Sequence, residues 1–399
     1  MRDAAQYLWS WLEWTLALLA SVLVINLVVD PYGLFPIVNI AGLNSVKSKA
    51  GERAALFKRT ALERMQPATV ILGNSRAEIG FDPESPSWPA SARPVFNLAL
   101  PGAGMAAVAR ELDMALKSTA PRLVLVGLDF VDFRIDPAAR DSFTLSATPA
   151  SALMALNERV EALLTMSALG DSLATIKGQH DPYPESLTAA GFNPKLDYIG
   201  IARREGYYAL FRQRDQENAA AYLRGPKAVF RSDGKPGPGF AAVDCIIAAA
   251  QRRGITLRFV IYPYHVHTLM LFHLTGLWPA YEDWKRELTW RVYAATATTD
   301  VELWDFSGFS PYADERVPRP GDTRTELQWY WEAGHFKKSL GDLLLADMLG
   351  GRERWGHRLT LQGIDARLRQ QRTARDEYES THGNEIADLE ALVSAVARR

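Results

Sequence analysis

The sequence predicts a three-layer α/β protein with a parallel sheet, preceded by a membrane helix, interrupted by a helical insertion and followed by a helical tail. Three observations lead to this prediction. Short, continuously apolar runs alternate with helical patterns, which is typical of parallel strands covered on both faces. A long apolar stretch precedes them, and a more polar helical region interrupts them after about residue 134. The 399 residues can form one large domain or two smaller ones.

The N-terminal residues 1–30 are predicted to be a membrane anchor. Leu16 to Val29 is mostly apolar, and Trp9, Trp11 and Trp14 cluster before it, as in a membrane span with an interfacial tryptophan belt. A cleaved signal peptide and a buried globular helix are the alternatives. We favour the uncleaved anchor, because the N-terminus is weakly basic and no clear small-residue cleavage site follows.

The few basic residues around this anchor give a weak orientation signal. Arg2 precedes the span, and Lys47 is the next basic residue after it. The bias favours an N-terminus inside the cytoplasm. We therefore expect a single-pass protein of the inner (cytoplasmic) membrane, with most of the chain periplasmic.

The rest of the chain divides into a linker, a core in two parts, an insertion and a tail. Asp30-Pro31 ends the first helix, and residues 31–66 form a linker and a basic helix. The expected ranges are 67–147 and 239–350 for the core, 148–238 for the insertion and 351–399 for the tail. Strands are predicted at Val70–Leu72, Val95–Leu98, Leu123–Gly127, Leu257–Tyr262 and Val301–Trp304, and helices at 104–118, 150–176, 203–223 and 240–253. The insertion is expected to be a lid or a docking surface. In the tail, only Trp355 to Leu368 is expected to pack on the core.

Composition excludes several classes of function. The hydrophobic fraction is 48%, the charged fraction 23% and the net charge −1, so no basic field suggests a nucleic-acid partner. The single cysteine, Cys245, excludes an intrachain disulfide and a zinc site with several cysteines. No glycine-rich phosphate loop follows any predicted strand, which disfavours a nucleotide-binding domain. We expect no metal and no cofactor.

One serine and one distant histidine are the strongest catalytic candidates. Ser75 follows the first strand, where a helix should begin, at the edge where open α/β sheets bind ligands. The simpler alternative is that Asn74 or Ser75 only caps that helix. A serine hydroxyl needs an imidazole to accept its proton and a carboxylate to orient that imidazole. His335 and Glu332, three residues apart on a helical turn or tight loop, are the expected pair.

Four short segments resemble the motif blocks of the SGNH hydrolases, the GDSL-like esterase family. They are Gly73-Asn74-Ser75, Asn97-Leu98-Ala99-Leu100-Pro101-Gly102, Gly127-Leu128-Asp129 and Glu332-Ala333-Gly334-His335. The resemblance implies a flavodoxin-like fold and a Ser75–His335–Glu332 triad, with glutamate in place of the usual aspartate. It also implies that the backbone N–H groups of Ser75 and Gly102 bind the oxyanion.

The third block departs from the family pattern. Asp129 stands where the family has an asparagine that donates to the oxyanion, and an ionised carboxylate would repel that charge. Losing one such donor costs about 10²–10³ in rate. Asp129 must therefore be protonated, turned away, or serve another purpose.

Five residues are further candidates for substrate binding: Asn97, Asp129, Arg76, His265 and Asp305. His265 and His267 are expected at alternate positions of an extended segment, but no carboxylate at ligand spacing supports a metal site. Asp305 is also the reserve triad acid, or else the cap of a turn. Arg76 could hold a carboxylate or phosphate group, or pair with Glu78.

Two functions are compatible with these features. The first is a serine esterase or O-acyltransferase acting on an acyl ester of an extracytoplasmic glycan or lipid-linked substrate. The second is an inactive SGNH-like domain that serves as a binding or assembly component of an envelope polysaccharide or acyltransferase complex. Either could work with a membrane acyltransferase or a polysaccharide-export partner, which is an analogy at the level of the fold.

Overall fold

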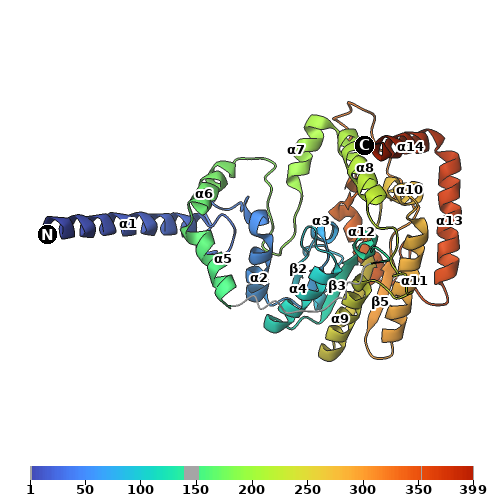
Figure 1. Ribbon diagram of the computed structural model, residues 1–399, viewed down its shortest axis with the longest axis horizontal. Coiled ribbons are helices and arrows are strands. Elements are labelled where there is room, and N and C mark those ends of the chain that lie inside the picture. The colour runs from blue at the N-terminus through green and yellow to red at the C-terminus, as the bar shows by residue number, and fades with distance from the viewer. Residues whose placement is uncertain (1, 139–151, 352, 399) are drawn as a thin grey trace. The chain divides into compact units, whose positions relative to one another are not determined.

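The computed structural model describes residues 2–138, 152–351 and 353–398, and the chain divides into two compact units (Figure 1). The first unit contains residues 1–61, 146–189 and 193–199, and the second contains 62–145, 190–192 and 200–399. The predicted insertion is therefore shared between the two units. Its predicted start at residue 148 lies outside the described residues.

A six-stranded sheet forms the centre of the second unit, in the order β2-β1-β3-β4-β5-β8. The strands are β1 (Thr69–Leu72), β2 (Val95–Asn97), β3 (Leu123–Leu128), β4 (Thr256–Ile261), β5 (Val301–Asp305) and β8 (His357–Arg358). The first five are mutually parallel and confirm the five predicted strands, whereas β8 pairs antiparallel with β5 and was not predicted. The parallel order 2-1-3-4-5 is one of the two common orders of doubly wound sheets.

Helices cover both faces of this sheet. The helices α4 (Met105–Ser118), α9 (Pro238–Arg253) and α11 (Trp278–Ala295) follow β2, β3 and β4, and α9 packs against both α4 and α11. The short α3 (Ser75–Gly80) follows β1 and packs against α12 (Lys338–Leu349). Because the chain moves from β1 to β2 in one direction and from β2 to β3 in the other, right-handed crossovers place α3 and α4 on opposite faces.

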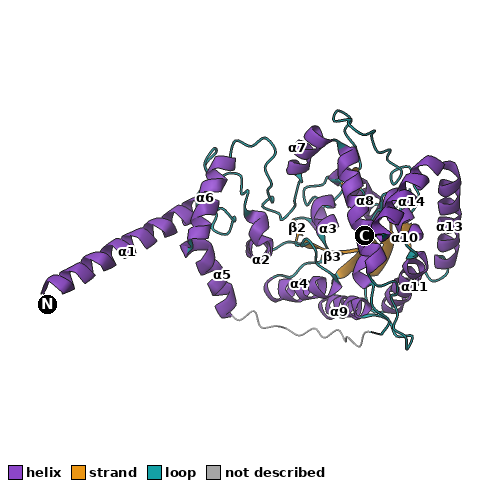
Figure 2. Ribbon diagram, turned by 45° about the horizontal axis from the view of Figure 1, so that its top comes forward, coloured by secondary structure: helices purple, strands orange, loops and turns teal. Residues whose placement is uncertain are grey.

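The remaining helices of the second unit gather at one side of the sheet (Figure 2). They are α8 (Tyr207–Arg224), α10 (Val266–Leu274), α13 (Ile364–Thr381) and α14 (Gly383–Ala397), while α7 (Leu196–Glu205) begins in the first unit and ends in the second. The expectation of a solvated tail beyond Leu368 is wrong: Tyr378, Ile386 and Leu389 are buried in one cluster with residues of α10. The short 3₁₀ helices are Ala50–Arg53, Ala90–Ala92 and Phe130–Phe133.

The first unit is helical. It contains α1 (Arg2–Val29), α5 (Ala152–Leu164), α6 (Met166–Gly178) and the start of α2 (Ala54–Met65). The predicted helix over 150–176 is interrupted at Thr165, whose hydroxyl accepts a hydrogen bond from Ala168 N at 3.2 Å and so caps α6. Within α1, Ala4–Val29 is long and apolar enough to cross a membrane, a criterion that a signal sequence also meets.

Candidate active site

The turn between β1 and α3 holds Ser75 at the carboxyl end of the sheet. Gly73 has a φ of +147°, and a Cβ there would lie 2.4 Å from the Tyr262 hydroxyl, so no side chain fits. Gly127, on the neighbouring strand, packs against the same tyrosine. Asn74 caps α3 by accepting from Arg76 N at 3.0 Å, which makes Ser75 the first residue of the helix. The capping role therefore belongs to Asn74, and the Ser75 hydroxyl is left for another partner.

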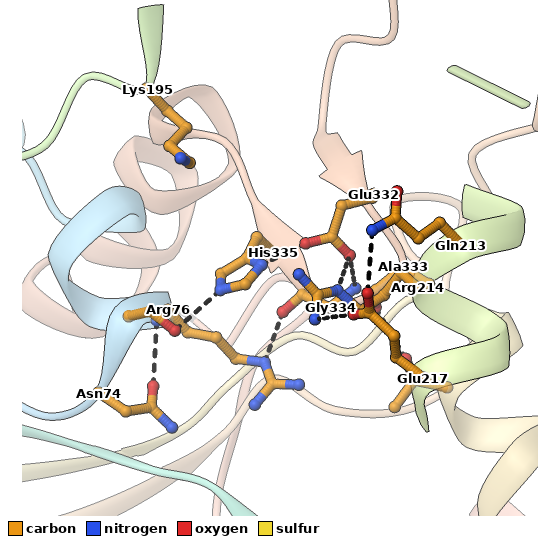
Figure 3. A network of polar contacts seen from close by, with 12 residues as sticks. Asn74, Arg76, Lys195, Gln213, Arg214, Glu217, Glu332, Ala333, Gly334 and His335 are labelled. Carbon is orange, nitrogen blue, oxygen red and sulfur yellow. Dashed lines mark hydrogen bonds and ion pairs between the residues drawn. The ribbon is translucent and has the colours of Figure 1, made fainter. Parts of the chain in front are cut away.

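That partner is His335. Its Nε2 lies 2.8 Å from Ser75 Oγ, across 260 residues of sequence, and its Nδ1 hydrogen-bonds with Glu332 Oε1. Glu332 is the last residue of β6 (Tyr330–Glu332), and His335 is the first residue of β7 (His335–Phe336). These two strands form a small antiparallel hairpin whose turn is Ala333 and Gly334 (Figure 3). Of the two expected local geometries, the structure has the tight turn and not the helical one. Serine, histidine and glutamate thus form one continuous hydrogen-bonded chain.

The Glu332 carboxylate is buried and held in its ionised form. It is 1% exposed, and its Oε2 accepts from Gly334 N at 2.5 Å and lies 3.1 Å from Arg214 Nε. Burial alone would raise the pKa of Glu332, but His335, Arg214 and the Gly334 N–H lower that pKa to about 2. Arg214 comes from α8, where the sequence offered no signal for a role at this site (Figure 3).

The loop after β2 lies beside the β1–α3 turn that carries Ser75. Leu98 N donates to Ile71 O at 2.8 Å, and Leu100 N donates to Gly73 O at 3.1 Å. Gly102, at the tip of this loop, has a φ of +70° and open space where a Cβ would point. These hydrogen bonds hold the segment that carries Gly102 against the β1–α3 turn, and α3 begins at Ser75 with first-turn amides of the kind that stabilise a developing negative charge.

Arg76 and Asp129 form a buried ion pair next to Ser75 and His335. Asp129, which follows β3 and is 1% exposed, forms an ion pair with Arg76. Its oxygens also accept from Asn74 Nδ2 at 3.0 Å and from the Tyr264 hydroxyl at 2.9 Å. Arg76 Nε donates to Gly334 O at 2.6 Å, immediately before His335. The negative charge of Asp129 is therefore neutralised, and the pair connects the β1–α3 turn to the β6–β7 hairpin.

A second carboxyl group lies next to this pair. Burial raises the pKa of Asp132 to about 6, although Arg76 and Asn74 both act to lower it. Its Oδ2 lies 3.5 Å from Asn74 Nδ2. Sequence reasoning did not select Asp132 or Tyr264, and the only signal for either was its place just beyond the end of a strand.

Three of the expected substrate contacts have other roles in the structure. Asn97 is fully buried, donates to the Ala77 and Phe81 carbonyls at 2.9 and 2.8 Å, and accepts from Ala99 N. These bonds hold the end of α3 against β2. Its side chain therefore stabilises the loop that carries Gly102.

His265 and Asp305 are also committed elsewhere. His265 caps α10 instead of lying on an extended segment, and its ring nitrogens contact His267 N and Glu315 O. Asp305 is 0% exposed, and its carboxylate pairs with Lys285 Nζ at 2.9 Å. This carboxylate therefore belongs to a buried ion pair and is not the acid that orients His335. Within the described ranges, no group of three or more His, Cys, Asp or Glu side chains is placed to hold a metal ion.

Two comparisons with known proteins found no match. No protein-family model matches the sequence, and no curated protein matches it either. The functional assignment therefore depends on the geometry of the site.

Proposed function

We propose that the protein is an SGNH-like serine esterase or O-acyltransferase with a Ser75–His335–Glu332 triad. The observation that supports this most is the chain of contacts from Ser75 Oγ through the His335 imidazole to the buried Glu332 carboxylate. A serine and a histidine that were close only by chance would have no reason to have a buried, ionised carboxylate hydrogen-bonded to the imidazole. The flavodoxin-like strand order and the four motif segments agree with the SGNH assignment.

The proposed reaction proceeds in two acyl transfers. Ser75 Oγ attacks the ester carbonyl while His335 Nε2 takes its proton, and the new C–O bond yields a tetrahedral oxyanion. The Ser75 and Gly102 amides stabilise that oxyanion. As the bond to the alcohol breaks, His335 returns the proton to the leaving oxygen. Water or an acceptor alcohol then attacks the acyl-enzyme by the same route and restores Ser75.

The Arg76–Asp129 pair supports catalysis over a purely binding role. An unpaired Asp129 carboxylate beside the oxyanion would oppose the reaction, but a guanidinium and two neutral donors already satisfy it. Two backbone donors remain instead of three, which predicts a slower enzyme and not an inert one. The apolar α1 suggests a substrate near a membrane, such as an acylated glycan or a lipid-linked sugar outside the cytoplasm.

The test is active-site labelling of the full chain in detergent with a fluorophosphonate probe. Wild type should label, and both Ser75→Ala and His335→Ala should lose labelling. Ser380→Ala and His180→Ala, two exposed positions outside the site, serve as matched controls and should label normally. Absence of labelling in a folded wild-type protein would overturn the hydrolase and favour the inactive binding component.

A further inference from the structure

Exposed apolar side chains are concentrated in the first unit. Among the large apolar residues exposed in the described part of the chain, eleven lie on α1, seven elsewhere in the first unit, and two in the second. Five of the seven lie on α5 and α6: Leu156, Val160, Leu164, Met166 and Leu173. The surfaces of soluble proteins rarely expose so many large apolar side chains close together, and such a patch is typical of a contact with a membrane or a partner.

These side chains form one stripe on each helix. On α5, Leu156, Val160 and Leu164 are spaced four residues apart and so share a face. On α6, Met166 and Leu173 are seven residues apart, which again places them on one face. The opposite face of α6 buries Ala168, Ser172 and Thr175. Each helix therefore carries an exposed apolar stripe, and on α6 a buried face lies opposite that stripe.

The same two helices are fastened to the last turns of α1. Val22, Asn26 and Val29 are the buried positions there, and α1 contacts both α5 and α6. Asn26 Nδ2 donates to Leu163 O at 2.9 Å, and Asn26 Oδ1 accepts from Ser172 Oγ at 2.8 Å. An amide within an apolar helix is costly to leave unpaired in a lipid environment. The α5–α6 pair supplies both of its partners.

Helix length places this junction at a membrane boundary. From Trp11, in the tryptophan cluster, to Val29 the helix rises about 27 Å, close to the ~30 Å thickness of a bilayer core. With the tryptophans at one interface, the turns that bind α5 and α6 lie at the other. Figures 1 and 2 both show α5 and α6 running across the end of α1, so that they lie along the membrane plane when α1 crosses it.

We propose that α5 and α6 form an interfacial collar around the end of the membrane span, with Leu156, Val160, Leu164, Met166 and Leu173 inserted into lipid at the boundary between headgroups and acyl chains. The collar packs against the end of α1, which is long and apolar enough to cross a membrane, and for this reason lipid is the expected occupant. The inference rests on α1 being a retained membrane span, and it does not depend on the chemistry of Ser75.

The experiment measures the depth of single labels in the full-length protein in nanodiscs. In a Cys245→Ser background, the single variants Leu156→Cys, Leu173→Cys, Leu19→Cys and Glu52→Cys are labelled with an environment-sensitive fluorophore. Lipids that carry nitroxides on their acyl chains then quench the fluorophores that lie in the membrane. Leu19 on α1 is the membrane reference, and the exposed, charged Glu52 is the water reference. Labels at 156 and 173 should be quenched at a depth of about 5–10 Å below the headgroup boundary.

Each outcome decides the proposal. Quenching at 19, 156 and 173 but not at 52 supports the collar. Quenching at 19 alone overturns it. If the labels at 156 and 173 are shielded from water in native membranes but not in nanodiscs, the patch contacts a protein partner instead of lipid. Loss of quenching at 19 removes the span itself and the collar with it. Fluorophosphonate labelling of Ser75 is read on the same samples, so failure of the enzyme is recorded separately.

Discussion

Replacing Glu332 by glutamine tests the triad most directly, because it removes a charge and keeps the shape. The Gly334 N–H, 2.5 Å from Glu332 Oε2, needs an acceptor. In Glu332→Gln the amide oxygen therefore faces Gly334, and the amide NH₂ faces His335 Nδ1. That contact favours the tautomer with its proton on Nε2, and an Nε2–H cannot accept the proton of Ser75.

The expected loss is about 10⁴-fold, the cost of the wrong tautomer in serine triads, or about 5 kcal/mol of transition-state stabilisation. The assay is the second-order rate constant for fluorophosphonate labelling of the full chain. Glu217→Gln is the matched control, because Glu217 bonds to Arg214 at 2.7 Å without touching His335. A Glu332→Gln rate within tenfold of wild type would refute the idea that Glu332 orients the base.

Four further outcomes are expected. Arg76→Ala leaves Asp129 buried without its cation and should cost about 3–5 kcal/mol of stability. Adding Asp129→Asn should recover part of that loss, and strictly additive shifts in melting temperature would contradict the pairing. Gly73→Ala should abolish labelling or folding, since its Cβ would lie 2.4 Å from the Tyr262 hydroxyl, whereas Gly234→Ala, also at a positive φ but with open space around it, should be only mildly destabilised. Although burial opposes it, Asp215 and Glu385 raise the pKa of His267 to about 10. Its stabilising contribution is thus complete below about pH 6.5 and is lost as the pH rises towards 10, so melting temperature should fall over that range in wild type and be flatter in His267→Gln. Burial raises but His335 lowers the pKa of Glu332, to about 2, so its stabilising contribution is complete above about pH 4.5 and is lost as the pH falls towards 2. Melting temperature should therefore fall over that range in wild type and fall less in Glu332→Gln, and an equal fall in both would contradict the assignment of this carboxylate as ionised.

The parallel strands could be predicted because their physical cause is local. A strand buried on both faces is expected to be continuously apolar, and runs such as Val70–Leu72 and Leu123–Gly127 carry that signal. The two-residue strand β8 and the hairpin of β6 and β7 could not be predicted in this way. Such short segments become strands only because a neighbour offers hydrogen bonds.

Errors arose where long-range packing decides the outcome. Polar residues dominate the sequence beyond Leu368, yet one side of α14, with Ile386, Leu389 and Leu392, is buried because it packs against α8 and α10. His265 and His267 follow a strand closely enough to suggest an extended segment. The chain instead begins α10 at Val266, with His265 as its cap.

The sequence by itself indicated candidates for nucleophile, base and acid, because a serine activated by an imidazole that a carboxylate orients is a recurrent catalytic arrangement, and the motif segments follow predicted strands or a turn. Only the tertiary structure decided that they meet. Ser75 and His335 are separated by 260 positions, and their contact depends on sheet order and on the hairpin that presents the imidazole. The role of Asp129 was decided there as well. A carboxylate at that position repels or supports depending on its neighbours, and folding brought it Arg76, Asn74 and Tyr264.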